Sequence, residues 1–334
     1  MTYAKAGVNI AKLEDSKDSI VEILEKTFKF RRDKFGEVQL DIGTFANLID
    51  IGNENLLAFT TDGVGTKVLI AQKFDKYDTI GIDLVAMLVN DLICLGAEPV
   101  AMVDYIALEK VDKNILKEIA KGIYKGAKIA NIAVVGGETA SLPDIIKGVK
   151  GKGFDLAGAA IGVVKKEKVI DGRKISPNDI VLGVKSSGIH SNGLSLARKV
   201  LPENMQIDLL KPTKIYSNLI LEILKEFEVN GLANITGGGF RNLQRITSFG
   251  FILDNLPKTP KVFQRIQRFG NISLKEMLQT FNMGVGFCII ADEKNANRIL
   301  MKYSRGYGIM RIGKVIHERG VIVIKNGKKI KLDN

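Results

Sequence analysis

The charged stretch at residues 165–179, KKEKVIDGRKISPND, lies between two largely apolar halves and constrains the fold more than any other feature. It combines charged residues with a glycine and a proline, a composition that is typical of a segment between domains. A chain of 334 residues is also too long for one ordinary hydrophobic core. We therefore expect an N-terminal domain over residues 1–165 and a C-terminal domain over residues 166–334.

Each half mixes strand-like and helix-like segments, which predicts an α+β fold with two mixed domains. The helix predicted at 112–130 has apolar residues on one side and lysines elsewhere, so it should cover a sheet. The first half also predicts strands at 56–61, 100–107, 132–136 and 155–164 and helices at 19–30 and 82–95. The second half predicts strands at 180–185, 285–291, 309–316 and 321–324 and helices at 193–201, 214–228, 240–247, 273–281 and 293–304. Ser273 and Glu276 have capping-box spacing, which favours a helix start there.

The strand-like run LAGAAIGVV at 156–164 carries Gly158 and Gly162 among small residues. Glycine weakens an isolated strand, so these positions predict tight sheet curvature or close backbone packing, as in a barrel or a subunit contact.

Composition indicates a globular chain with 46% hydrophobic residues. We expect a soluble, cytoplasmic protein, because the N-terminal residues lack the apolar core of a signal peptide and apolar runs such as 84–89 are far shorter than the ~18 residues of a membrane helix. Cys94 and Cys288 are isolated and are expected to be core residues. With only His190 and His317, a metal site built from several imidazoles is excluded.

The formal charge of +12 favours anionic ligands, whether nucleotide, phosphosugar or nucleic acid. Lys261, Arg265 and Arg268 recur at helical intervals, but such a stripe is usually a solvated helix face. Aromatic residues make up 7% of the chain and no aromatic-rich RNA-recognition strand is present, so we expect neither a nucleic-acid nor a membrane partner.

The turn TTDGVGTK at 60–67 follows the apolar run NLLAF and is typical of a binding loop. Asp62 beside Lys67 suggests a metal and a polyphosphate. By itself, the segment fits a surface turn with an incidental ion pair slightly better.

Acidic residues in two other segments strengthen the metal interpretation. The run at 80–96 is apolar except for Asp83, Asn90 and Asp91. Asp83 is explained as a helix N-cap, whereas Asp91 must meet a basic side chain or face a cation. Glu138 follows another apolar strand in VVGGET, and three oxygen ligands suit Mg²⁺.

Two glycine-rich junctions in the second half, at 184–200 and 234–246, each lead from a predicted strand into a helix. Exposed amides at such junctions bind phosphate, although ordinary turn chemistry with a cap explains either one alone. Neither a P-loop, nor a complete dinucleotide fingerprint, nor the G-x-S-x-G of a serine hydrolase is present.

Together these segments resemble the aminoimidazole ribonucleotide synthetase family, also called phosphoribosylformylglycinamidine cyclo-ligases. The resemblance spans nearly the whole chain and rests on the order and spacing of motifs that are weak singly. The N-terminal motifs are Y-x-x-A-G-V at 3–8, TDGVGTK at 61–67, DTIGIDLVAM and VNDL at 78–92, GAEP at 96–99 and GGETA at 136–140. The C-terminal motifs are SSG-x-HSNG at 186–193, PT-x-IY at 212–216, TGGGF at 236–240 and FN-x-GVG at 281–286.

The resemblance implies ATP, Mg²⁺ and a homodimer whose N-terminal sheets join into a barrel, with the active site at the domain and subunit junction. It implies that formylglycinamidine ribonucleotide is the small-molecule substrate. Its amide oxygen is phosphorylated by ATP, a nitrogen attacks the activated carbon, and phosphate leaves as the imidazole ring closes.

The resemblance also implies roles for individual residues. Asp62, Asp91 and Glu138 are the expected Mg²⁺ ligands, Lys67 the triphosphate contact, and His190 a group that orients substrate or moves a proton, with an inert hydrogen-bonding histidine as the alternative. The remaining residues expected to contact ATP or the ribose phosphate are Gly63, Gly65, Thr66, Thr139, Ser186, Ser187, Gly188, Ser191, Asn192, Gly237, Gly238 and Gly239.

Several positions depart from the family pattern. The segment DIGTFANL at 41–48 keeps only Gly43 and Phe45 of the usual G-G-x-G-G-F-G loop, which puts the mobility of that loop in doubt. Asn9 replaces an aspartate and Asn234 replaces a frequent histidine.

Four other functions compete with this one. Selenophosphate synthetase is disfavoured because no cysteine lies near the N-terminus, and thiamine-phosphate kinase because it shares too little of the second half. Formylglycinamidine ribonucleotide synthase lacks this combination of length and motifs. A nucleotide- or RNA-binding module without catalysis is the alternative from another class.

Overall fold

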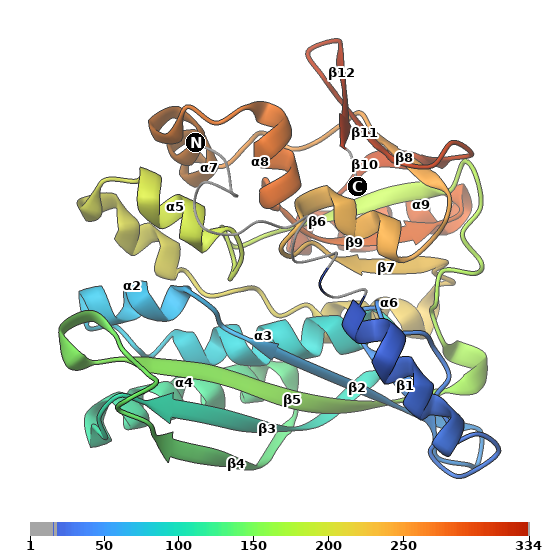
Figure 1. Cartoon of the computed structure of the whole chain (residues 1–334). Helices are drawn as coiled ribbons and strands as arrows, with labels where there is room; N and C mark the ends of the chain where they lie inside the picture. Colours follow the sequence, from blue (N-terminus) through green and yellow to red (C-terminus); the bar gives the residue numbers. More distant parts are fainter. Residues whose placement is uncertain (1–15, 17–18, 333–334) are drawn as a thin grey trace.

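The computed structural model describes residue 16 and residues 19–332, which form two sheets stacked one above the other in Figure 1. The motif at 3–8 and Asn9 lie outside the described residues. The strands of the first sheet end at Lys165 and those of the second begin at Ile180, on either side of the charged stretch. None of the helices in the described residues is both long enough and apolar enough to cross a lipid bilayer.

The N-terminal sheet has five strands in the order β1-β2-β5-β3-β4. All neighbours are antiparallel except β3 and β4, which run parallel. The strands are β1 Asn47–Asp50, β2 Asn55–Gly63, β3 Glu98–Leu108, β4 Ala133–Ser141 and β5 Phe154–Lys165. A short 3₁₀ helix, η1 Glu25–Phe30, precedes them, where the sequence predicted the end of a longer helix.

The central strand β5 depends on its glycines for close packing. A Cβ atom on Gly158 would lie 2.7 Å from the carbonyl oxygen of Val103 and 3.1 Å from Cδ1 of Leu88. A Cβ atom on Gly162 would lie 2.8 Å from the carbonyl oxygen of Glu98. The predicted close backbone packing is therefore confirmed, and it occurs within the chain's own sheet.

Helices cover one face of this sheet and leave the other open. The helices are α2 Lys67–Phe74, α3 Ile80–Ile93 and α4 Lys113–Ala130, and Figure 1 shows α3 between the sheet and the C-terminal domain. The predicted helix at 112–130 is confirmed, with Asp112 as an N-cap that accepts hydrogen bonds from two backbone amides. The open face carries exposed apolar side chains, namely Phe59, Val103, Tyr105 and Val135.

The C-terminal sheet has seven strands in the order β12-β11-β8-β10-β6-β9-β7. Its strands are β6 Ile180–Lys185, β7 Gly231–Asn234, β8 Gly250–Leu253, β9 Val285–Ala291, β10 Ile309–Ile316, β11 Val321–Lys325 and β12 Lys328–Leu332. Its α-helices are α5 Leu194–Val200, α6 Ser217–Glu226, α7 Lys261–Gly270, α8 Leu274–Thr280 and α9 Glu293–Tyr307. Every residue of β9 is buried, which fits the prediction of a sheet covered by helices.

Local predictions in this half are mostly confirmed. Ser273 caps α8 by accepting a hydrogen bond from the amide of Glu276. The helix predicted at 240–247 is instead a 3₁₀ helix, η5 Gly239–Arg245. The basic stripe lies on α7, whose opposite side buries Phe263 and Ile266, so the solvated-face interpretation is confirmed.

Candidate active site

Asp62 and Asp91 lie within electrostatic reach of each other. Asp62 is near the end of β2, and Asp91 is in the last turn of α3, where it accepts a 2.9 Å hydrogen bond from the amide nitrogen of Asn234. Burial and the charge of Asp62 raise the pKa of Asp91 to about 7, while Asn234 and Arg245 oppose that rise. A bound cation would offset the electrostatic repulsion between these two carboxylates.

Glu138 does not join this pair within one chain. Two adjacent rows of cross-strand neighbours cross the sheet here. The first comprises Asp62, Gly158, Asp104 and Gly137, and the second comprises Gly63, Ala157, Tyr105 and Glu138. Neighbours in one row point to the same face, and a Cβ atom on Gly158 would face Leu88 of α3. Asp62 is therefore on the helix side, whereas Glu138 is three strands away on the open face.

No three His, Cys, Asp or Glu side chains converge as a metal site among residue 16 and residues 19–332. The prediction that Asp62, Asp91 and Glu138 meet around one ion is thus wrong for a single chain. The sequence showed that each acid follows or interrupts an apolar segment, but it contained no signal for the sheet order that separates β4 from β2.

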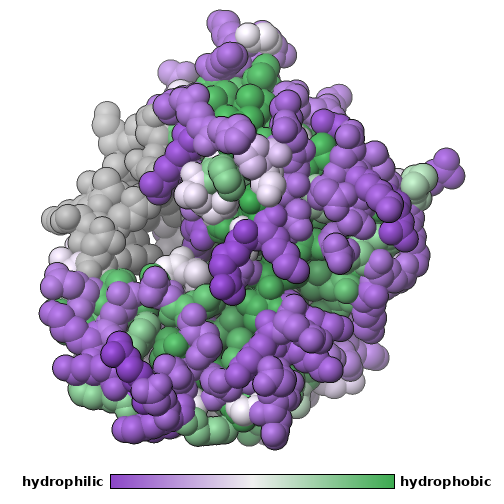
Figure 2. Space-filling model, turned by 90° about the vertical axis from the view of Figure 1, so that its right-hand side faces the viewer, coloured by the Kyte–Doolittle hydropathy of each residue, from purple (hydrophilic) through white to green (hydrophobic). Residues whose placement is uncertain are grey.

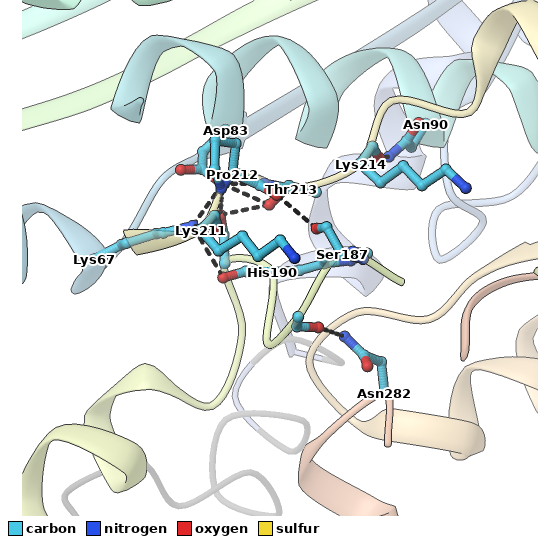
Figure 3. Close-up of polar contacts among 12 residues, drawn as sticks. Lys67, Asp83, Asn90, Ser187, His190, Lys211, Pro212, Thr213, Lys214 and Asn282 are labelled. Atoms are coloured by element: carbon cyan, nitrogen blue, oxygen red, sulfur yellow. Dashed lines mark hydrogen bonds and ion pairs between the residues drawn. The ribbon is translucent and has the colours of Figure 1, made fainter. Parts of the chain in front are cut away.

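Lys67 is the first residue of α2 and is fully buried. Its ammonium donates hydrogen bonds to Asp83 Oδ1 at 2.8 Å, to the carbonyl oxygen of Lys211 at 2.8 Å and to that of His190 at 3.3 Å (Figure 3). Burial lowers the pKa of Lys67, and the neighbouring Asp83 charge opposes that change. For a direct contact with the triphosphate, the Lys67 ammonium would have to give up its present hydrogen bonds, which surround it.

Asp83 collects donors from both halves of the chain. Besides Lys67, its Oδ1 accepts from the Thr213 amide at 2.7 Å, the Thr213 hydroxyl at 2.6 Å and the Ser191 hydroxyl at 3.1 Å. Its Oδ2 is buried with no hydrogen-bond partner in the described part of the chain. The explanation of Asp83 as the helix N-cap is wrong, because the N-cap of α3 is Thr79.

His190 is buried between these contacts and the C-terminal sheet. Its Nε2 accepts a 3.3 Å hydrogen bond from the amide of Ser187, and its ring centroid lies 6.2 Å from that of Tyr216. Burial and the charges of Lys67 and Lys214 lower the pKa of His190 to about 3. The imidazole is therefore neutral near pH 7, which favours the hydrogen-bonding alternative over proton transfer.

The two glycine-rich junctions meet at one end. Oδ1 of Asn192 would lie 3.1 Å from a Cβ atom on Gly237, and the amide nitrogen of Asn192 is buried without a partner among the described residues. From the N-terminal domain, the hydroxyl of Thr66 lies 3.2 Å from that of Ser195. Gly239 has a positive φ of +57°, and a Cβ atom there would lie 2.1 Å from a backbone oxygen, so only glycine fits this turn.

The other end of the first junction, Ser186 to Gly188, lines a different cavity of about 550 Å³. That cavity is lined by none of Asp62, Asp91 and Glu138, and by neither Asn192 nor Gly237. Another cavity, of about 470 Å³, lies at the linker and is lined by none of the predicted site residues. The linker side faces the viewer in Figure 2, where hydrophobic residues gather in the lower and middle part of a mostly hydrophilic surface.

Two residues whose side chains act at the domain contact were not predicted, Asn90 and Thr213. Asn90 donates to the carbonyl of Lys214 at 2.9 Å and accepts from the amide of Tyr216 at 2.9 Å. Thr213 binds Asp83 as described above. Their signals were present, since Asn90 interrupts an apolar helix and the segment at 212–216 is one of the family motifs.

Arg245 holds the segment that departs from the family's glycine-rich loop. It donates to the carbonyl oxygens of Gly43 at 3.1 Å and Thr44 at 2.7 Å, and its guanidinium lies 4.1 Å from the centroid of the Phe45 ring. Local sequence patterns contain no direct signal for this contact, because residues 43–45 and 245 are about 200 positions apart.

Two family models match the chain. The AIR synthase related protein N-terminal domain matches residues 43–164, and the corresponding C-terminal domain matches residues 176–326. A phosphoribosylformylglycinamidine cyclo-ligase of Pyrococcus furiosus is 50% identical over 98% of this chain and 99% of its own length. The enzyme of that name from Methanocaldococcus jannaschii is 43% identical over 99% of this chain and 95% of its own length.

Solved structures support the α+β fold at low sequence identity. The hydrogenase maturation protein HypE in complex with ATP is 21% identical, with a TM-score of 0.64 over 83% of this chain and 84% of its own. The structure described as AaThiL complexed with AMPPCP and TMP is 15% identical, with a TM-score of 0.66 over 94% of this chain and 95% of its own. From both family models and the full-length relatives, the chain belongs to the phosphoribosylformylglycinamidine cyclo-ligase family.

Proposed function

We propose that the chain catalyses the ATP-dependent ring closure of formylglycinamidine ribonucleotide to 5-aminoimidazole ribonucleotide, a step of purine biosynthesis. The observation that carries this proposal is the 50% identity to a phosphoribosylformylglycinamidine cyclo-ligase over essentially the whole of both chains. The two domain-family matches cover both halves and support the same assignment.

The reaction needs activation of an amide oxygen, which is a poor leaving group. Transfer of the γ-phosphoryl group from ATP to this oxygen releases ADP. A substrate nitrogen then attacks the same carbon, and the carbon–oxygen bond breaks to release phosphate. Because ring closure is intramolecular, a protein that holds the substrate folded lowers the entropic part of the barrier.

We propose that the triphosphate lies over the turn at 62–66 and the meeting point of the two glycine-rich junctions. The open turn at Gly65 and the unpartnered amide of Asn192 support this placement. Gly238 and Gly239 have positive φ angles, a backbone geometry that is typical of anion-binding turns. Thr139, on β4, stays a prediction as a further ATP contact.

Asp62 and Asp91 fit an Mg²⁺ site, because the charge of one raises the pKa of the other and both supply hard oxygen ligands. When bound, the ion would neutralise charge on the phosphoryl group. We propose that Glu138 serves the site of a second copy of the chain. The exposed apolar residues on the open sheet face, with β4 at its edge, support a homodimer formed through this face.

Lys67 acts on the triphosphate indirectly in this proposal. Its ion pair with Asp83 and its bonds to two C-terminal carbonyls hold the start of α2, and hence the turn before it, against the C-terminal domain. The cytoplasm is the expected location.

A stoichiometric assay tests the function. Purified chain with Mg²⁺, ATP and formylglycinamidine ribonucleotide should form 5-aminoimidazole ribonucleotide and ADP in equal amounts. ADP formation that does not depend on this substrate, or phosphorylation of thiamine monophosphate offered in its place, would contradict the proposal.

A further inference from the structure

The cavity at the start of the SSG-x-HSNG segment, here called the basic cavity, is rich in lysine. It has a volume of about 550 Å³, and its polar lining includes Lys76, Thr79, Lys185, Ser187 and Lys211. The stem of Lys211 runs beside Gly188, where a Cβ atom would lie 3.8 Å from Lys211 Cδ. A space of this size accommodates a phosphorylated small molecule.

The positive charge of the basic cavity is not balanced by its own acids. Neither Lys185 nor Lys211 forms an ion pair with any residue that the structure describes. The single lining acid, Asp208, is bound by Arg265 at 2.8 Å, and Lys76 is bound by Asp78 at 3.0 Å. Two lysines of the cavity are therefore available to an anion.

A neighbouring lysine shows that cations are crowded here. Lys214 is held by the carbonyl oxygens of Lys185 and Tyr307, each at 3.4 Å, rather than by a carboxylate. Burial and then the charge of Lys185 lower the pKa of Lys214. Like charges held this close repel each other, and a bound anion would offset that repulsion.

Thr79 provides an independent sign of a missing partner. It lines the cavity, is only 8% exposed, and its hydroxyl has no hydrogen-bond partner in the described ranges. Buried hydroxyls are nearly always satisfied by a protein group, a water or a ligand. Thr79 also immediately precedes the 14-residue helix α3, whose N-terminal end favours anions through the helix dipole.

The basic cavity is separate from the acids of the proposed ATP site. Thr79 and Asp91 are twelve positions apart along α3, which corresponds to about 18 Å at 1.5 Å per residue. The buried contacts of Lys67, Asp83 and Thr213 lie between them along the domain boundary. One phosphate cannot occupy both places.

We propose that the basic cavity is a second anion site, which binds a phosphate group through Lys185 and Lys211 apart from the acid-lined site of ATP. The proposal depends on the proposed function only for the compound that carries the phosphate. In that context the source is either the 5′-phosphate of the ribonucleotide substrate or free phosphate released by the reaction.

Calorimetry with inorganic phosphate, in the absence of Mg²⁺ and ATP, tests the site directly. The full chain should bind phosphate, and the variant Lys185→Gln/Lys211→Gln should bind it at least about tenfold more weakly, because two charge-assisted contacts are lost. The matched control Lys113→Gln/Lys117→Gln removes the same charge from exposed positions of α4 and should bind as the parent does. Asp91→Asn should also bind phosphate normally.

Thermal unfolding of each variant checks its fold, and Lys211→Gln keeps the backbone carbonyl that Lys67 uses. The proposal is overturned by a parent chain that does not bind millimolar phosphate, by equal affinity in the Lys185/Lys211 variant, or by loss of binding in Asp91→Asn. These results are independent of the ring-closure assay. The anion-site proposal can therefore be wrong while the proposed function is right, and the proposed function can be wrong while the anion site exists.

Steady-state kinetics of the same variants distinguish the two sources. A KM for formylglycinamidine ribonucleotide that rises about tenfold or more, with an unchanged KM for ATP, assigns the cavity to the substrate's 5′-phosphate. Unchanged KM values for both substrates, with phosphate binding lost, assign it to free phosphate.

Discussion

At the scale of single residues, the ion pair of Lys67 and Asp83 is expected to be sensitive to substitution. Both side chains are completely buried, so the pair has given up its hydration and depends on its own contacts. Removing one partner leaves a charge with no solvent around it. This makes Lys67 a structural residue first, whatever its relation to the nucleotide.

Lys67→Met should reduce the free energy of unfolding by about 3 to 5 kcal/mol, because Asp83 would be left buried and uncompensated. Urea denaturation measures this change. The double variant Lys67→Met/Asp83→Asn should lose less than the sum of the two single variants. A Lys67→Met protein with parental stability and impaired ATP binding would show instead that Lys67 contacts the nucleotide.

His190 should make the folded state sensitive to acid. Its pKa of about 3 in the folded chain is below the ordinary value of 6.5, so its contribution is present above pH 6.5 and is lost as the pH falls towards 3. We expect the loss to reach the order of a few kcal/mol. His190→Asn, which tolerates the positive φ of +62°, should flatten the dependence of urea midpoints on pH between 7 and 4. Identical pH dependence in the two proteins would contradict this assignment.

At the scale of elements, the domains are joined by contacts that run from loops of one to helices of the other. Asn90 and Asp83 on α3 bind the segment at 213–216, and Asn234 at the end of β7 binds Asp91. Arg245 on η5 fixes residues 43–45. The turn at 62–66 and both glycine-rich junctions are therefore positioned by the same interface.

Arg245→Met should loosen the segment at 43–45 without unfolding the chain. The lost hydrogen bonds and the cation–π contact are worth about 1 to 2 kcal/mol together at this exposed position. Hydrogen exchange of amides at 41–48 should therefore quicken by roughly tenfold. The control Arg268→Met, on the solvated face of α7, should leave these amides unchanged. If amides at 41–48 exchange equally slowly in Arg245→Met and in the parent, Arg245 does not hold this segment.

The sequence predicted the long elements well and the short ones poorly. Helix α4 and strand β5 have strong patterns, because each must bury a continuous apolar face. Strands β1, β7 and β8 have only four residues each, too few to show a period, and were not predicted. Their positions are decided by pairing with distant strands.

The sequence predicted which residue types form the candidate site, but not which of these residues lie close to one another. The acids near β-strand ends indicated a cation, and Asp62 and Asp91 do lie within electrostatic reach. The separation of Glu138 depends on strand order and on which face of β4 it occupies. The enclosure of Lys67 depends on carbonyls more than 120 positions away. Local sequence contains neither kind of information.

At the scale of the whole molecule, the open face of the N-terminal sheet and the position of Glu138 point to one arrangement. A homodimer that covers this face would bury exposed apolar side chains and bring Glu138 to a second subunit. Each active site would then contain residues from both chains.

Mixing two inactive variants tests this arrangement. If Glu138 serves the other subunit's site, a heterodimer of Asp91→Asn and Glu138→Gln has one site with both defects and one intact site. Random subunit exchange should then restore about one quarter of the parental activity, since half of the dimers are mixed and half of their sites are intact. With one variant labelled with ¹⁵N so that mass spectrometry resolves the mixed dimers, a mixture that remains inactive after verified exchange would place Glu138 in its own chain's site or outside catalysis.

The most direct measurement of the central claim is the fate of the substrate's amide oxygen. Formylglycinamidine ribonucleotide labelled with ¹⁸O at this oxygen should yield 5-aminoimidazole ribonucleotide and inorganic phosphate that carries the label, detected by mass spectrometry. Unlabelled phosphate formed together with the ring product would contradict phosphorylation of that oxygen, and the absence of the ring product would contradict the function itself.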